Sequence, residues 1–399
     1  MDSEVSERVT SLLQDEIDWS YLRSRARRHG LTPLLYRSLK CAPPEAVPKA
    51  VLDQLQQYFL TNAWRNLLLT EELLEVLHLF KTHGIPAIPY KGPVLAASVY
   101  GDPGLRQIID LDILIPKEEI LKARNLLLSL GYQTEFRFAN ARQAAAYQRS
   151  QYELVLTRDQ GRVIVELKWE IVDRFFSFPM DYRSLWDRLK PVSLAGKEVL
   201  TLSPEDLILI LCVHGAKHLW TSLIWVCDVA GVLYVCKGLD WDWIMNQAGL
   251  LGGQRILYLG LLLSKDLFGA SVPEEIGKRV GADPMVRTLA EQVKQSLFQT
   301  SNGSSPSLWE SSVFHLKVRE NLKDRIRYCG RLALNTTPGD WNVRSLPDSL
   351  FPLYYLIRPF RLSAKYGLQL LGHINYWIHS QYKKKKNEVD RKSPIALSC

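Results

Sequence analysis

The spacing of apolar residues changes twice along this chain, and this change constrains the fold more than any other feature. Between residues 85 and about 200, short apolar runs are separated by turn-forming residues, as in Ile85 to Tyr90, Ile108 to Ile115, Leu154 to Leu156 and Val163 to Leu167. Runs of this length are typical of β-strands. Longer segments with helical spacing lie between and on either side of them. Strands that alternate with helices predict an α/β or α+β domain between two helical regions.

The ends of the helical segments suggest where the regions meet. An amphipathic stretch runs from Pro48 to Lys81 and is followed by Gly84, a residue type that commonly ends helices. Ser203 followed by Pro204 is a strong helix start. The apolar segments after it predict further helices, one over 250–268 and a last one over about 350–382, with a polar loop at 299–306. We therefore predict an N-terminal helical region over residues 1–84, an α/β core over 85–202, a C-terminal helical domain over 203–382 and a basic, disordered tail over 383–399.

Charge and cysteine usage limit the class of protein. The net charge of +8 is concentrated from Lys323 onward, where 14 Lys and Arg outnumber 5 Asp and Glu. We interpret the lysine run at 383–386 as a solvated tail, with a nucleic-acid or membrane contact as the less favoured alternative. The 6 cysteines show no CxxC spacing, the first residues do not resemble a signal peptide, and no apolar stretch has transmembrane length. These features predict a cytoplasmic protein with free thiols and no transmembrane segment.

Three carboxylates carry the strongest chemical signal. Asp110 and Asp112 stand two residues apart in a predicted strand, so both side chains project from the same face. Two like charges at this spacing repel unless a cation lies between them. Oxygen ligands suit Mg²⁺ or Mn²⁺, and two-metal phosphoryl-transfer sites use this arrangement. Glu166, in a second apolar strand, is the third expected ligand, on the ion that would activate the attacking hydroxyl.

A candidate phosphate-binding segment precedes these carboxylates. Lys91 and Gly92 fall where a predicted strand turns into a helix, with Pro93 at the first helical position. Gly92 would let backbone N–H groups approach phosphate oxygens, Lys91 would neutralise a triphosphate, and Arg106 would hold it bidentately. In the alternative, Lys91 and Arg106 form ion pairs with the predicted metal ligands.

Two histidines form the remaining candidate site. His214 and His218 lie four residues apart, on one face of a predicted helix. Zinc is disfavoured because Gly215 takes the place of the glutamate that a metalloprotease needs there. The histidines could line the site and contact phosphate or an acceptor. The favoured interpretation is that they pack the helical domain against the sheet, with Asp228 as their structural partner.

These motifs follow one another in an order that resembles a known family. They are Lys91-Gly92, Tyr100-Gly101-Asp102, Arg106, Asp110-Leu111-Asp112, Gly131-Tyr132, Glu166-Leu167-Lys168-Trp169, His214-Gly215-Ala216-Lys217-His218 with Trp225 and Asp228, and Leu353-Tyr354-Tyr355 with Arg358-Pro359. The chain resembles the uncharacterised nucleotidyltransferase family of the DNA-polymerase-β-like superfamily. This resemblance implies an α+β fold, in which a nucleotidyltransferase-type mixed sheet is flanked by N-terminal and C-terminal helical regions.

The resemblance also implies an activity. We expect a metal-dependent transfer of a nucleotidyl group from an NTP to a hydroxyl or phosphate acceptor, within a biosynthetic pathway. The acceptor would be a small molecule, a peptide or a saccharide, and RNA is less favoured. Lys91-Gly92-Pro93 stands where the superfamily usually carries Gly-Ser or Gly-Gly, which leaves the mode of nucleotide binding open. The alternatives are transfer of a sugar or another phosphate-linked group, and a catalytically silent domain that binds a nucleotide or a partner.

Overall fold

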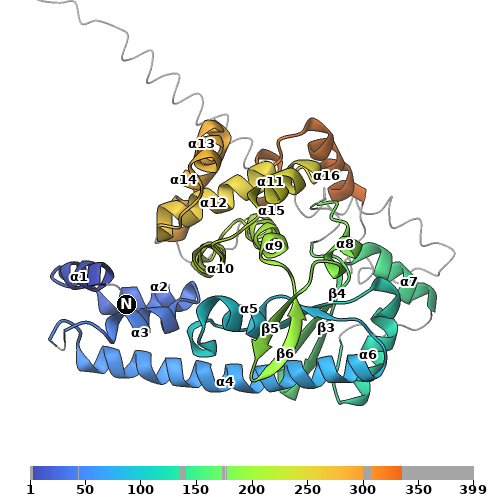
Figure 1. Ribbon diagram of the computed structural model, residues 1–399, viewed down its shortest axis with the longest axis horizontal. Helices are drawn as coiled ribbons and strands as arrows, with labels where there is room; N and C mark the ends of the chain where they lie inside the picture. The colour runs from blue at the N-terminus through green and yellow to red at the C-terminus, as the bar shows by residue number, and fades with distance from the viewer. Residues whose placement is uncertain are drawn as a thin grey trace, which may run out of the picture.

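A four-stranded sheet that mixes parallel and antiparallel pairs lies at the centre of the molecule (Figure 1). Its spatial order is β1 (Ile88–Pro89), β2 (Leu111–Leu114), β4 (Val163–Lys168) and β3 (Glu153–Arg158). Strands β2 and β4 are parallel, whereas β1 and β3 pair antiparallel at the two edges. Each strand overlaps a run predicted from the sequence, and the predicted α+β class with a mixed sheet is confirmed. The computed structural model describes residues 3–43, 45–134, 141–172, 176, 178–299 and 307–334.

Four helices precede the sheet, and the last of them is by far the longest. They are α1 (Ser3–Leu12), α2 (Trp19–Arg28), α3 (Thr32–Leu39) and α4 (Lys49–Thr82). Helix α4 matches the amphipathic stretch predicted from Pro48 to Lys81. It ends before Gly84, whose positive φ of 68° suits a residue that lacks a Cβ atom.

Short helices and a hairpin connect the strands of the core. The helices are α5 (Gly92–Leu95) with a π-helical continuation (Ala96–Tyr100), 3₁₀ turns at Pro103–Leu105, Lys117–Glu119 and Asp159–Gly161, α6 (Ile120–Ser129), α7 (Ala141–Ser150) and α8 (Tyr182–Trp186). The hairpin of β5 (Lys190–Leu194) and β6 (Lys197–Thr201) was not predicted. Its turn residues, Ala195 and Gly196, both have positive φ, as a tight hairpin turn requires.

Helices follow the hairpin to the end of the described chain. They are α9 (Pro204–Lys217), α10 (Leu223–Val235), α11 (Trp241–Leu250), α12 (Gln254–Phe268), α13 (Glu274–Ala282), α14 (Pro284–Phe298), α15 (Leu308–Lys317) and α16 (Leu322–Leu334). The apolar segment predicted as one helix from Leu250 to Phe268 is broken at Gly252, where φ is 64°. The predicted helix at 350–382, the basic tail and most of the predicted loop at 299–306 lie outside the described residues. The four region boundaries stay predictions.

The sequence predicts free thiols and no transmembrane segment, and the described residues bear on both. Each of the five cysteines described is a free thiol, namely Cys41, Cys212, Cys227, Cys236 and Cys329. None of the described helices is both long enough and apolar enough to cross a membrane.

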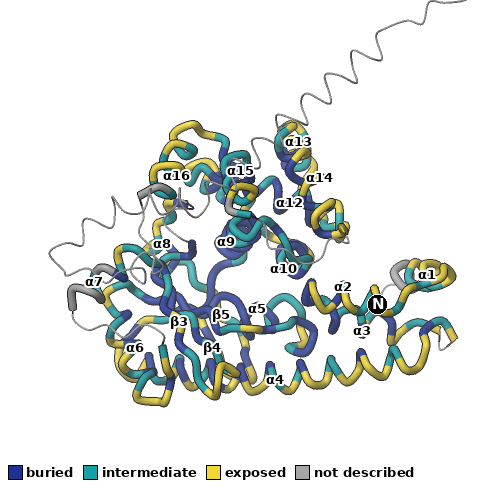
Figure 2. The backbone as a smooth tube through the Cα atoms, turned by 180° about the vertical axis from the view of Figure 1, so that it is seen from behind, coloured by how far each residue is buried: buried dark blue, intermediate teal, exposed yellow. Residues whose placement is uncertain are grey.

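Alternation along the strands divides the side chains of the sheet between two cores. Leu111 and Ile113 of β2 join Val165 and Leu167 of β4 in a core that includes the buried side of α4. Leu114 belongs to the other core, which α9, α10 and α12 build on the opposite side of the sheet (Figure 1). Figure 2 shows buried backbone through the strands, α5 and α9, in contrast to the exposed outer side of α4. The even-numbered positions of β2 and β4 therefore face the C-terminal helices.

Helix α4 also holds the loop that leads into β2. The Asn62 amide donates to the carbonyl of Gly104 at 2.8 Å, and the Asn66 amide donates to Pro103 at 2.6 Å and to Arg106 at 2.7 Å. Asn66 is fully buried, so no water replaces these bonds. The N-terminal region thereby fixes the approach of the chain to its acidic strand.

Replacing Asn66 by alanine tests this anchor. Asn66→Ala removes the donor to the Pro103 carbonyl and leaves the Arg106 carbonyl with only the longer 3.3 Å bond from Asn62. We expect it to lower the free energy of unfolding by about 1–3 kcal/mol. Urea unfolding followed by circular dichroism measures the change, with the exposed Gln56→Ala on the same helix as the control. Equal stability of the two variants would show that α4 does not anchor the loop.

Candidate functional site

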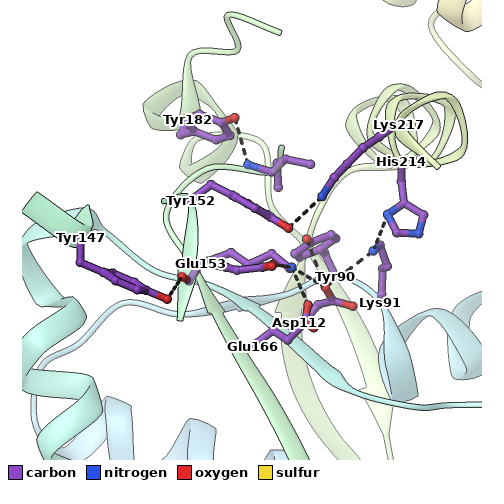
Figure 3. A network of polar contacts seen from close by, with 12 residues as sticks. Tyr90, Lys91, Asp112, Tyr147, Tyr152, Glu153, Glu166, Tyr182, His214 and Lys217 are labelled. Carbon is purple, nitrogen blue, oxygen red and sulfur yellow. Dashed lines mark hydrogen bonds and ion pairs between the residues drawn. The ribbon is translucent and has the colours of Figure 1, made fainter. Parts of the chain in front are cut away.

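Charged side chains gather on the face of the sheet that is turned toward the C-terminal helices (Figure 3). Asp112 and Glu166 stand directly opposite each other in the parallel pair of β2 and β4, so their side chains share that face. Glu153 of β3 stands opposite Lys168 of β4 in the antiparallel pair. Two of the three predicted metal ligands are thus brought together by strand pairing alone.

Lys168 lies between the carboxylates. Its Nζ is 2.6 Å from Oε2 of Glu166 and 3.4 Å from Oδ1 of Asp112, and it also donates to Glu153. Burial disfavours the charge, but Tyr90 and the surrounding carboxylates outweigh burial and raise the pKa of Lys168 well above its usual value. The ammonium is therefore charged, and it balances part of the acidic face.

Asp112 is the most enclosed of the acids and has a second cationic partner. Its side chain is only 3% exposed, and its Oδ1 lies 3.6 Å from Nζ of Lys91. Burial alone would raise the pKa of Asp112, yet Lys91 and Lys168 hold it below the usual value. The Tyr90 hydroxyl donates to the same oxygen over a long 3.5 Å. Asp112 is consequently an ionised carboxylate whose Oδ1 lies near the Nζ atoms of two lysines.

Asp110 differs because its carboxylate has no hydrogen bond or ion pair with the described residues. Burial, together with the nearby carboxylates of Asp112 and Glu166, raises the pKa of Asp110 to about 6. Gly92, with φ of 57°, packs against this residue, and a Cβ there would lie 3.1 Å from the Asp110 carbonyl oxygen. Gly92 therefore fixes the backbone that carries Asp110, a role that differs from the predicted approach to phosphate.

Helix α9 brings two further side chains to the site. His214 accepts a hydrogen bond at Nδ1 from Nζ of Lys91 at 3.2 Å. Burial and the charge of Lys91 lower the pKa of His214 well below its usual value, so the imidazole is neutral. Lys217 donates to the hydroxyl of Tyr152 at 2.8 Å. His214 thus links Lys91, the predicted phosphate-binding lysine, to helix α9. Lys217 links the same helix to Tyr152, the neighbour of Glu153.

His218 stands one turn further along and packs rather than reaching the carboxylates. Its ring lies 4.7 Å from that of His214 and 5.3 Å from that of Trp225, measured between centroids. Burial and the positive charge of Lys217 lower its pKa to about 3. These contacts join α9 to α10 within the helical region. Of the two histidines, His214 is the one that reaches the core, through Lys91.

Arg106 is not positioned as the sequence predicted. Its guanidinium donates from Nε and Nη2 to the two oxygens of Asp228 in α10, each at 2.9 Å, and the Tyr100 hydroxyl donates to Asp228 at 2.7 Å. Asp228 was expected to partner the histidines, and Arg106 to bind phosphate or to pair with Asp110 or Asp112. The buried guanidinium instead satisfies its charge with a carboxylate from a helix more than 100 residues later. The pair fastens α10 to the loop before β2.

The chemistry of the donors limits how this site could hold a metal ion. Within the described ranges, no three His, Cys, Asp or Glu side chains are placed to hold an ion by themselves. Mg²⁺, however, is commonly held by one or two carboxylates together with substrate phosphates. Asp110 and Asp112 fit that role, because Asp110 is unpaired among the described residues and lies close enough to Asp112 for that carboxylate to raise its pKa. Glu166 is engaged by Lys168.

Lys168 and Glu153 were assigned no role from the sequence, although a signal for both existed. Lys168 stands two residues after Glu166 in the same strand, so the period of two places both side chains on one face. Glu153 begins a run that pairs with that strand across a short turn. The register of this hairpin, which decides that Glu153 faces Lys168, comes only from the folded structure.

The fold and the site together define a class: an α+β protein with paired acids at a central parallel strand pair and buried lysines beside them. The family described as "Uncharacterised nucleotidyltransferase" matches residues 15–269, and the chain belongs to this family. No curated protein matches. Among solved structures, the chain is similar to an antigenic nucleotidyltransferase-like protein from Paracoccidioides brasiliensis, with 14% identity over 55% of this chain and 93% of that one. Its TM-score of 0.31 adds nothing to the argument.

Removing one half of the buried pair tests whether Arg106 is structural. Asp228→Ala leaves a buried guanidinium unpaired, and we expect it to lower the free energy of unfolding by about 3–5 kcal/mol. The double variant Arg106→Met/Asp228→Leu removes both charges and should be clearly more stable than Asp228→Ala in urea unfolding. If Arg106 were instead free to bind phosphate, Asp228→Ala would leave stability unchanged.

The raised pKa of Asp110 predicts a dependence of stability on pH. Its ordinary value is 3.8 and its folded value is about 6, so the folded state holds the extra proton between these limits. The ionised carboxylate therefore lowers stability above pH 6, and this cost disappears below about pH 4. We expect Asp110→Asn to raise the free energy of unfolding at pH 7.5 by about 1–3 kcal/mol, and to have little effect at pH 4.

Urea unfolding at both pH values measures this difference. Asp159→Asn, at an exposed position, is the matched control and should change stability little at either pH. A gain from Asp110→Asn that is the same at pH 4 and pH 7.5 would contradict the assignment.

Proposed function

We propose that this protein transfers a nucleotidyl group from an NTP to a hydroxyl or phosphate acceptor, with Asp110 and Asp112 as the residues that hold a divalent ion. The observation that carries the proposal is the unpaired, partly buried Asp110 beside the ionised Asp112, in a member of a nucleotidyltransferase family. An unpaired carboxylate at such a position destabilises the fold, and residues that do so are common at functional sites.

The proposed reaction needs no nucleophilic side chain. The acceptor oxygen would form a bond to the α-phosphorus while the bond to pyrophosphate breaks, and the acceptor proton would leave to a carboxylate or to water. A bound Mg²⁺ or Mn²⁺ would offset the charge on the phosphates. Lys91 is the side chain placed to contact a phosphate oxygen, since its Nζ already lies between Asp112 and His214.

His214 would keep Lys91 in position without competing for the phosphate. Because its Nδ1 accepts from the lysine, the neutral ring orients the ammonium and adds no positive charge. The acceptor is proposed to be a small molecule, a peptide or a saccharide that approaches from the side of the C-terminal helices. A cytoplasmic location and a role in biosynthesis belong to the same proposal.

One observation favours a second candidate, a domain that binds nucleotide without turnover. Lys168 lies among the carboxylates at the place where a catalytic ion would be expected, and the described residues contain no group of three metal ligands. Such a domain would bind an NTP and release no pyrophosphate. Transfer of a sugar would differ from both in the mass that is added to the acceptor.

Pyrophosphate release with each of the four NTPs and Mg²⁺ or Mn²⁺ tests the proposal, with lysate metabolites and RNA as acceptors. We expect release by the wild type, and a loss of at least about 100-fold in Asp110→Asn/Asp112→Asn, because the charge on the phosphates is then uncompensated. Asp159→Asn should retain full activity, and circular dichroism checks the fold of each variant.

The mass of the product identifies the group transferred and the class of acceptor. Binding of nucleotide by calorimetry, with no release from the wild type, would favour the silent domain. Release that persists in the double variant would remove Asp110 and Asp112 from the site.

A further inference from the structure

Lys168 is unusual because one ammonium contacts three carboxylates from three strands. Glu166 shares its strand, Asp112 comes from β2, and Glu153 comes from β3. The lysine side chain is 6% exposed, whereas those of Glu153 and Glu166 are about 20% exposed. The cation is therefore more deeply buried than Glu153 and Glu166, and lies beside the still less exposed Asp112.

A metal ion and this ammonium would compete for the same oxygens. A divalent ion bound between Asp112 and Glu166 needs carboxylate oxygens at about 2.0–2.6 Å. The Nζ of Lys168 already lies 2.6 Å from Oε2 of Glu166 and 3.4 Å from Oδ1 of Asp112. Two cations at one position would repel strongly, so an ion there requires the lysine to leave a buried network.

We propose that Lys168 is a built-in substitute for the second metal ion, so that the site takes a single divalent ion on Asp110 and Asp112. This inference rests on the proposed function, because it concerns the second cation of that same site. Lys168 is then a positioning residue, which holds Asp112 and Glu166 in place through its charge. Glu166, predicted from the sequence as a metal ligand, becomes the partner of the lysine.

Two substitutions at Lys168 separate a cation substitute from an ordinary structural ion pair. Lys168→Ala removes the charge and opens space next to three carboxylates, whereas Lys168→Met removes the charge and keeps most of the volume. Only the alanine variant leaves both the ligands and the room for an ion. An ordinary ion pair would make the two variants alike in metal binding.

Counting bound Mn²⁺ by electron paramagnetic resonance, with the metal alone as the probe, tests the inference. We expect one Mn²⁺ per wild-type chain, two in Lys168→Ala, and one in Lys168→Met. Mn²⁺ should also raise the melting temperature of Lys168→Ala more than that of Lys168→Met. Two ions on the wild type, or no gain in Lys168→Ala, would overturn the inference.

A variant at Glu166 keeps the test decisive if Lys168→Ala does not fold. Glu166→Gln should leave the number of Mn²⁺ bound by the wild type unchanged, since Glu166 is not a ligand. Loss of the bound Mn²⁺ from Glu166→Gln would show that Glu166 is a ligand and would overturn the inference. The Mn²⁺ counts do not depend on turnover, so they test this inference by itself. If the proposed function is wrong, the wild type releases no pyrophosphate.

Discussion

Charge compensation on one face of the sheet is the constraint on which the rest of the site depends. Ionised carboxylates are costly to enclose unless cations lie close by. Lys168, in strand β4, and Lys91, in the segment that follows β1, both lie near the carboxylate of Asp112. Among these acids, Asp110 has no cationic partner in the described part of the chain. Burial and the neighbouring carboxylates raise its pKa, so negative charge at this position is not fully compensated. This imbalance supports the proposal that Asp110 and Asp112 hold a divalent ion.

The helices after the sheet belong to this site as much as the strands do. Helix α9 supplies His214, which contacts Lys91, and helix α10 supplies Asp228, which neutralises Arg106. Helix α4, on the other side of the sheet, holds the loop before β2 through Asn66. The family match extends from residue 15 to residue 269 and therefore covers all three helices. A sheet domain without its helical flanks would lack the contacts that set the geometry of the acids.

Sequence reasoning was most effective where chemistry and local periodicity coincide. The spacing of Asp110 and Asp112 in an apolar run predicts two acids on one strand face, and Glu166 in a second strand predicts a third. In the structure Asp110 lies one residue before β2, outside the predicted strand. The sequence did not predict the partner of Arg106, whose position in the motif suggested that it binds phosphate. The partner of that guanidinium lies in another helix more than 100 residues away, and no local pattern specifies such a long-range pair. The hairpin of β5 and β6 was missed because two five-residue strands carry too little periodicity to stand out.

The sequence by itself determined the class of fold, the family, the long helix α4 and the strands that carry the acids. These follow from the period of apolar residues, from turn and cap residues, and from motifs that lie close together in the chain. Only the tertiary structure decided which charges meet. The parallel register of β2 and β4 sets Asp112 opposite Glu166, and the pairing of β3 with β4 brings Glu153 to Lys168. Register and helix docking arise from packing between distant segments, so the cation that each carboxylate receives is a property of the folded chain.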